Sequence, residues 1–382
     1  MDIDFDFDAI RPYRDHEVNE VVCRLVQDPS FIKFVQYILP SWHEEEIKAL
    51  PSHIHSIKDF QKKVTYDAIS AIREKTTTGI THSGMDRLQP DQSYLLITNH
   101  RDILLDSAFM NVLLYEQNLG TTEVAIGDNL LITPLITDLA RLNRNFAVNR
   151  NVSSKQLYQY SLRLSAYIHT TLFENDTSVW IAQREGRTKD GDDRTQPGLL
   201  KMLGMHSHLR FEEAYRSLKI LPVAISYEIE PCDVLKSIEM YKKEAGIAFT
   251  KKPQDDLNSM LTGLKQQKGK VHFAFGTPLH EELDQLATIV NKNEQIKEMA
   301  ARIDTQIHQN YRLSPNNYIA SDVLNATDEF SSHYSASEKE TFLAYVARLV
   351  QESGVDAAAF RPIVLKMYAN PLKNKIKAKV NY

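Results

Sequence analysis

A histidine and two carboxylates lie close together in the segment 99–106, which reads Asn-His-Arg-Asp-Ile-Leu-Leu-Asp. The apolar run at 94–97 before it predicts a strand, and the apolar spacing after Ile103 predicts a helix. Open α/β sheets bind their ligands at such strand ends. A neutral imidazole can act there as a general base if a carboxylate holds its other ring nitrogen. The alternative is that His100 and Asp106 only cap the helix and satisfy one another.

Three further polar clusters follow or lie in predicted strands of the same region. They carry Arg150 after the run 145–148, then Glu185, Gly186, Arg187 and Lys189 in a loop, and Pro222 in the run 220–226. Arginine and lysine are suited to bind phosphate, and glycine lets the backbone approach an anion closely. Each arginine alone could equally form a surface salt bridge. Their common position after strands of one sheet favours a phosphate site near His100.

The pattern of apolar residues predicts an α/β fold with a mostly parallel central sheet covered by helices. We expect strands at 94–98, 123–127, 145–148, 178–183, 220–226 and 271–276, and helices between them at 103–118, 130–142, 154–173, 208–217 and 255–267. The α/β domain would cover residues 91–280. An N-terminal helical subdomain at 1–90 and a C-terminal helical extension at 281–382 would flank it.

The flanking segments give more local expectations. N-terminal helices are expected at 16–26, after Asp28 and at 57–72, with a break at 76–79 and a polar connection at 84–92. Towards the C-terminus we expect one or two helices at 281–308, a helix at 337–352 and a last helix at 355–368. Ser337 and Glu340 have the spacing of a capping box. A tail with four lysines follows Pro371.

The composition is that of an ordinary globular protein, with 382 residues, 42% apolar residues and a net charge of −5. This charge does not favour nucleic acid as a partner. The two cysteines, Cys23 and Cys232, predict neither a disulfide framework nor a thiolate metal cluster. The His53/His55 and His206/His208 pairs lack a nearby third ligand, so we expect no metal. Gly-rich nucleotide fingerprints and a G-x-S-x-G elbow are absent from the sequence, and no cofactor is implied.

The N-terminus is acidic and has no apolar core of a signal peptide, and no apolar run is long enough to span a bilayer. We expect a cytoplasmic protein, or one bound at the surface of the inner face of a membrane. The lysine-bearing tail could contact an anionic membrane. A merely solvated tail is the alternative.

The order of these blocks resembles that of the glycerolipid acyltransferases, a family that includes glycerol-3-phosphate, dihydroxyacetone-phosphate and lysophosphatidate acyltransferases. The blocks are Asn-His-…-Asp, then Val-Asn-Arg ending at Arg150, then Glu-Gly-Arg at 185–187, then Leu-Pro-Val-Ala-Ile at 221–225. The similarity spans about residues 90–280. The later segments at 225–228 and 241–246 are similar to the glycerol-3-phosphate and dihydroxyacetone-phosphate branch, and the segment at 271–278 resembles the strand that closes the domain in many members of the family.

The resemblance implies a role for each candidate residue. His100 would take the proton from an acceptor hydroxyl that attacks an acyl thioester, and Asp106 would orient the imidazole. Arg150 and Arg187 would hold the acceptor's phosphate, with Lys189 as a further cation. Glu185 would brace the Gly186-bearing loop, and Pro222 would shape the acyl or thioester side of the cleft.

The sequence departs from the family pattern in two places. Five residues separate His100 from Asp106, whereas the family usually has four, so Asp102 is a rival partner for His100. Arg187 follows Gly186 directly, whereas the family usually has one residue between them. Arg184, Lys189 or Arg194 could therefore take over a phosphate-binding role.

Taken together, these patterns predict an acyltransferase of phospholipid synthesis. It would move a fatty acyl group from acyl-CoA or acyl-carrier protein to a hydroxyl of a glycerol-phosphate or lysophospholipid acceptor. Two alternatives stay open, namely an acyltransferase for a non-phosphorylated lipid acceptor and a catalytically weak lipid- or acyl-carrier-binding protein of the same fold.

Overall fold

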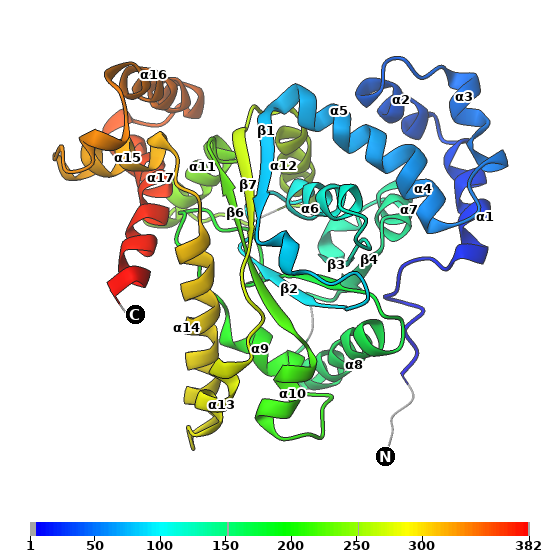
Figure 1. Cartoon of the computed structure of the whole chain (residues 1–382). Coiled ribbons are helices and arrows are strands. Elements are labelled where there is room, and N and C mark those ends of the chain that lie inside the picture. Colours follow the sequence, from blue (N-terminus) through cyan, green and yellow to red (C-terminus); the bar gives the residue numbers. More distant parts are fainter. Residues whose placement is uncertain (1–4, 151–152, 251, 381–382) are drawn as a thin grey trace.

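The computed structural model describes residues 5–150, 153–250 and 252–380, and its centre is a seven-stranded sheet (Figure 1). The strands lie in the order β1-β7-β6-β2-β5-β3-β4. Neighbouring strands are parallel except β6 and β7, so β1 and β7 run opposite to the other five. The strands are β1 (Thr77–Ser83), β2 (Leu95–Thr98), β3 (Glu123–Gly127), β4 (Asn145–Val148), β5 (Val179–Ala182), β6 (Ile220–Tyr227) and β7 (Gly269–Phe275). The predicted fold class is confirmed.

The helix before 76–79 ends there as expected, at Thr76, but strand β1, which begins at Thr77, was not predicted. It pairs with β7 at the edge of the sheet, and most of its side chains are exposed. An edge strand of this kind has no buried face along its length, so its sequence, Thr-Thr-Gly-Ile-Thr-His-Ser, lacks an alternating apolar pattern. The sheet therefore begins inside the segment expected to be helical, and we propose a domain boundary nearer residue 77 than residue 90.

Helices cover both faces of the sheet because the central strands bury side chains on both sides. In β2, Leu96 packs into one apolar cluster, while Leu95 and Ile97 pack into the other. The first cluster is covered by the N-terminal helices and α6, and the second by helices that include α8, α9 and α14.

The helices up to β4 are α1 (Asp15–Leu25), α2 (Pro29–Ile38), α3 (Glu44–Lys48), α4 (Ile57–Phe60), α5 (Tyr66–Thr76), α6 (Leu105–Glu116) and α7 (Pro134–Leu142).

The helices after β4 include three that the sequence pattern did not predict, α9, α11 and α15. In chain order they are α8 (Ser154–Phe173), α9 (Pro197–Leu203), α10 (Phe211–Ser217), α11 (Asp233–Glu244), α12 (Pro253–Lys265), α13 (Glu281–Ala287), α14 (Lys292–Asn310), α15 (Pro315–Asn325), α16 (Ala336–Ser353) and α17 (Ala357–Val380). Helices α11 and α15–α17 share a third apolar cluster beside the sheet. Among the described residues, no helix is long and apolar enough to cross a membrane.

Two C-terminal expectations are corrected. The capping box of α16 is formed by Ser335 and Glu338, whose side chains accept hydrogen bonds from each other's backbone N–H, and not by Ser337 and Glu340. The segment after Pro371 is not a loose tail, because α17 continues through it to Val380. Leu372 is buried there, and Lys375 Nζ donates to the Tyr311 carbonyl at 2.7 Å.

The packing of α17 against the loop after β5 predicts a stability difference between two glycine variants. Gly191 has φ +74°, and a methyl group there would overlap the Met367 carbonyl oxygen in α17. Gly354 has φ +66° with no atom near the place of a methyl group. Gly354→Ala should cost about 1 kcal/mol for its left-handed backbone, and Gly191→Ala should cost clearly more. Urea unfolding measures both, and equal losses would contradict the contact with α17.

Candidate active site

The turn that carries His100 is fixed to the neighbouring strand β6. Strand β2 ends at Thr98, and the Asn99 side chain donates from Nδ2 to the Ile225 carbonyl at 2.9 Å. Asn99 Oδ1 also accepts the N–H of Ile225 at 2.7 Å. Asn99 is fully buried, so this pair of bonds replaces hydrogen bonds to water. His100 is thereby placed at the carboxyl end of a central parallel strand.

Asp106, in the first turn of α6, is the carboxylate that contacts His100. Its Oδ2 lies 2.9 Å from His100 Nδ1 and accepts the N–H groups of Arg101 and Asp102 at 2.6 and 3.0 Å. Its Oδ1 accepts the Tyr227 hydroxyl at 2.8 Å. Burial acts to raise the pKa of Asp106, but these hydrogen bonds outweigh it, and the pKa lies below its usual value. Asp106 is therefore ionised near neutral pH and favours the imidazole tautomer that carries its proton on Nδ1.

This tautomer leaves Nε2 of His100 as a proton acceptor. Nε2 has no hydrogen-bond partner within the described part of the chain, and the side chain is 12% exposed. The imidazole packs edge-on against Trp180 of β5, with 5.5 Å between ring centroids. A general base needs this combination of a fixed ring and a free basic nitrogen.

Asp102, the rival partner, faces away from the imidazole. Its Oδ1 accepts the N–H groups of Leu104 and Leu105, both at 2.9 Å, and so caps the start of α6. Its Oδ2 lies against Gly263 of α12, where an added methyl group would overlap it. The structure thus pairs His100 with Asp106 across the longer spacing, while the catalytic role of both residues stays a prediction.

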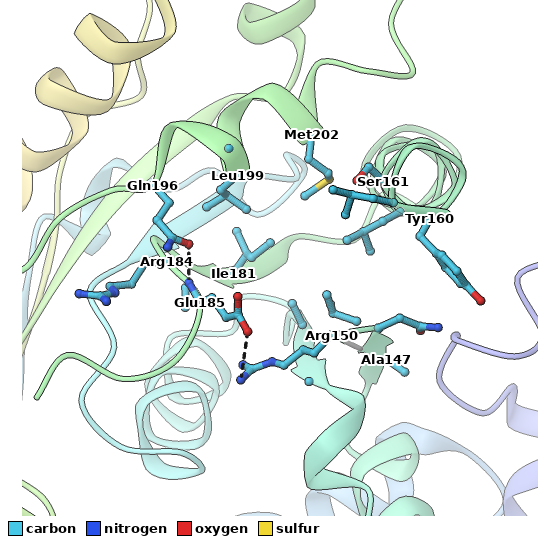
Figure 2. A pocket seen from close by; sticks show the side chains of 18 of the residues that line it. Ala147, Arg150, Tyr160, Ser161, Ile181, Arg184, Glu185, Gln196, Leu199 and Met202 are labelled. Carbon is cyan, nitrogen blue, oxygen red and sulfur yellow. Dashed lines mark hydrogen bonds and ion pairs between the residues drawn. The ribbon is translucent and has the colours of Figure 1, made fainter. Parts of the chain in front are cut away.

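Arg150 and Glu185 line a partly apolar cavity, to which Arg163 and Arg184 also contribute (Figure 2). Arg150 Nη1 is 3.9 Å from Glu185 Oε1, and the Glu185 side chain is 67% exposed. The Arg150 backbone N–H donates to Asp128 at 3.2 Å. The cavity has a volume of about 320 Å³ and lies between β4, β5, α8 and α9, and its apolar lining includes Ala147, Leu164, Ile181, Leu199 and Met202.

Arg187 lies in different surroundings from Arg150. The loop that carries it runs beside the turn of His100, because the Thr188 N–H donates to the His100 carbonyl at 2.8 Å. Gly186 has φ +71°, and the Arg187 side chain that follows is 91% buried next to Cys232. Burial raises the pKa of the Cys232 thiol to about 11, although Arg187 acts to lower it. Arg187 Nη1 has no hydrogen-bond partner among the residues described.

The remaining predicted residues occupy structural positions. Lys189 forms an ion pair with Glu239 of α11. Pro222 lies inside β6, opposite Ile97 of β2, and its carbonyl accepts the Gly276 N–H at 2.9 Å. It does not line the apolar cavity. Its predicted role at the acyl side of the cleft stays a prediction, as does phosphate binding by Lys189.

A buried ionic network surrounds Arg101, the residue after His100. No role was assigned to it from the sequence. Arg101 donates to Asp193 at 2.5 Å and to Glu230 at 3.0 Å. Lys236 donates to Glu230 at 2.6 Å and to the Arg101 carbonyl at 2.7 Å. Burial acts to lower the pKa of Arg101, but the two carboxylates raise it well above its usual value. The residues are up to 135 positions apart, so no local spacing could reveal the network.

The described residues hold no group of three or more His, Cys, Asp or Glu side chains that could bind a metal ion. The candidate site combines an imidazole with an ionised carboxylate at the carboxyl end of β2, next to the loop of Arg187, with Arg150 and a partly apolar cavity at the carboxyl ends of β4 and β5. Such a site can deprotonate a hydroxyl group beside an apolar chain and an anion.

Comparison with known proteins agrees with this chemistry. Residues 79–226 match the family model described as Acyltransferase. The matched range contains every predicted site residue from His100 to Pro222. Residues 79–226 therefore carry an acyltransferase domain, and the predicted class of enzyme, an acyltransferase, is confirmed.

One similar solved structure is the 1-acyl-sn-glycerophosphate (LPA) acyltransferase, PlsC, from Thermotoga maritima. The alignment covers 75% of this chain and 92% of that chain, with 12% identity and a TM-score of 0.36. Because this similarity is low, the family assignment depends on the sequence match. The comparison with curated proteins found no match.

The two carboxylates near His100 can be separated by matched variants. Asp106→Asn should lower kcat by about 10³-fold to 10⁴-fold, because the amide cannot fix the tautomer or stabilise the imidazolium. Asp102→Asn keeps a capping oxygen, and asparagine is about as good an N-cap as aspartate, so kcat should stay within about threefold. Thioester turnover measures kcat, and thermal melts check that both variants fold. A larger loss for Asp102→Asn would contradict the pairing.

Proposed function

We propose that the protein transfers a fatty acyl group from a CoA or carrier-protein thioester to a hydroxyl of a glycerol-phosphate-type acceptor, as a step of phospholipid synthesis. The observation that supports this best is the contact of His100 with the buried, ionised Asp106 inside the matched acyltransferase region. Glycerol 3-phosphate and lysophosphatidate are the acceptors that fit.

In this reaction His100 Nε2 takes the proton of the acceptor hydroxyl while the oxygen attacks the thioester carbonyl carbon. The carbon–oxygen bond forms, the carbon–sulfur bond breaks, and the thiolate leaves with the bonding electrons. The imidazolium then returns its proton to the sulfur. Asp106 stabilises the imidazolium through Nδ1, and Tyr227 holds the carboxylate in place. No acyl-enzyme is required.

The acceptor phosphate is assigned to Arg187 and Arg150. A buried guanidinium with an unused N–H carries an energetic cost that an anion would relieve, and Arg187 Nη1 is such a group beside the His100 turn. Arg150 is only loosely paired with Glu185 and can turn towards an anion. Holding the phosphate would fix the acceptor hydroxyl near Nε2.

The acyl chain is assigned to the apolar cavity between α8, α9 and the sheet. The cavity opens beside Arg150 and Glu185, at the same edge as His100. Its apolar lining suits an alkyl chain, which gains free energy when it leaves water. We propose that the thioester group lies at the cavity mouth and the chain lies inside.

The catalytic assignment predicts the behaviour of His100→Ala. Acceptor-dependent thiol release from a long-chain acyl thioester should fall by about 10²-fold to 10⁴-fold, the usual range for loss of a general base. His280→Ala, an exposed histidine before α13, is the matched control and should retain full activity. Activity that survives in His100→Ala would rule out the mechanism. Absence of thiol release with every glycerol-phosphate and lysophospholipid acceptor would rule out the enzyme.

The phosphate assignment predicts that arginine variants respond to the acceptor. For Arg187→Gln and Arg150→Ala, KM for glycerol 3-phosphate should rise about 10-fold to 100-fold, because each loses a charge-assisted hydrogen bond. The rate with glycerol, which has no phosphate, should not change. Arg210→Ala removes an exposed arginine of a remote ion pair and serves as the control. Equal losses with both acceptors would favour a non-phosphorylated acceptor instead.

A further inference from the structure

The loop between α11 and α12 presents apolar side chains to solvent among lysines. Ile247 is 48% exposed and Phe249 is 38% exposed. Residues 242–252 contain four lysines and one glutamate. Lys242 Nζ lies 4.8 Å from the centre of the Phe249 ring, and the one glutamate, Glu244, pairs with Lys366. The loop thus combines apolar side chains with excess positive charge.

A glycine ends α11 at the start of this loop. Gly246 has φ +67°, its N–H donates to the Lys243 carbonyl, and the Ile247 N–H donates to the Lys242 carbonyl at 2.8 Å. This is the bonding pattern of a glycine-terminated helix. It satisfies the last carbonyls of α11.

A second apolar pair lies on α8, beside the mouth of the cavity. Leu157 is 55% exposed and Tyr158 is 61% exposed, and Lys155 precedes them on the same exposed turn. Leu157 lines the cavity together with Arg150. The second apolar pair thus belongs to a helix that begins next to Arg150.

The α11–α12 loop is connected to this mouth through the start of α12. Asp256, in the first turn of α12, accepts a hydrogen bond from Asn129 at 3.0 Å. A methyl group on Gly127 would overlap both Asn129 and Arg150, so these two side chains lie next to each other. The start of α12, which directly follows the α11–α12 loop, therefore lies close to Arg150, as does the start of α8.

We propose that Tyr158, Ile247 and Phe249, with Lys155, Lys242, Lys243 and Lys252, form a surface that docks on an anionic lipid bilayer. Apolar side chains ringed by lysines can enter the interface while the charges contact acidic headgroups. An acidic carrier protein would match the lysines alone and gives no reason for protruding apolar tips. The proposal deepens the proposed function, because a lipid substrate would then enter directly from the membrane.

Flotation of the purified full chain with vesicles tests this surface independently of catalysis. Wild-type protein should float with phosphatidylglycerol/phosphatidylcholine vesicles and much less with phosphatidylcholine alone. The triple variant Tyr158→Ser, Ile247→Ser, Phe249→Ser should bind at least about 10-fold more weakly, since interfacial binding scales with buried apolar area. Lys242→Gln, Lys243→Gln and Lys252→Gln together should weaken binding and reduce its dependence on salt.

Two controls isolate the surface. Val290→Ser and Leu209→Ser remove exposed apolar side chains elsewhere and should not change binding. Lys377→Gln with Lys379→Gln tests the end of α17 and should also have no effect. Unchanged flotation of the triple variant, equal weakening by the controls, or no flotation of wild type would overturn the proposal. Thiol release from a short-chain, water-soluble thioester should be unchanged in the triple variant. If the wild-type protein releases no thiol from this thioester, that result would contradict only the proposed function.

Discussion

Arg101 is a fully buried cation, and the arrangement around His100 depends on how its charge is neutralised. Asp193 and Glu230 bind its guanidinium, and Lys236 balances the second carboxylate. Breaking one member of such a network leaves an uncompensated buried charge, at a typical cost of about 3–5 kcal/mol. The network therefore holds together the end of β2, the loop after β5 and the start of α11.

This anchor explains how a histidine and an aspartate with five intervening residues still meet. With the Arg101 side chain directed into the network, the N–H groups of Arg101 and Asp102 both donate to Asp106. Asp102 then caps α6 through the next two N–H groups, and the extra residue is absorbed in this turn. The Asp106 carboxylate thus fixes the turn and orients the imidazole with the same oxygen.

The sequence was sufficient for six of the strands, which depend on local patterns, but it left Asp102 and Asp106 as rival partners of His100. Six strands follow from apolar runs between turn residues, while the polar edge strand β1 has no such run. Where a side chain points was harder to predict. Gly186 lies in the left-handed region, and the Arg187 side chain lies next to Cys232, which the residue order did not indicate. The Arg101 network depends on tertiary contacts, for which no local pattern exists.

The same network determines from which side substrates can reach His100. On the β6 side of β2, the Tyr311 ring lies 5.5 Å from the Arg101 guanidinium. The Tyr368 hydroxyl of α17 donates a hydrogen bond to Asp233 and accepts one from the Glu230 N–H. The C-terminal helices therefore close that side and act as part of the same folded unit. On the other side, the β4 and β5 ends lead to the apolar cavity and Arg150. Because the cavity on this second side is lined in part by apolar side chains, we infer that acyl donor and lipid acceptor approach His100 from the Arg150 side.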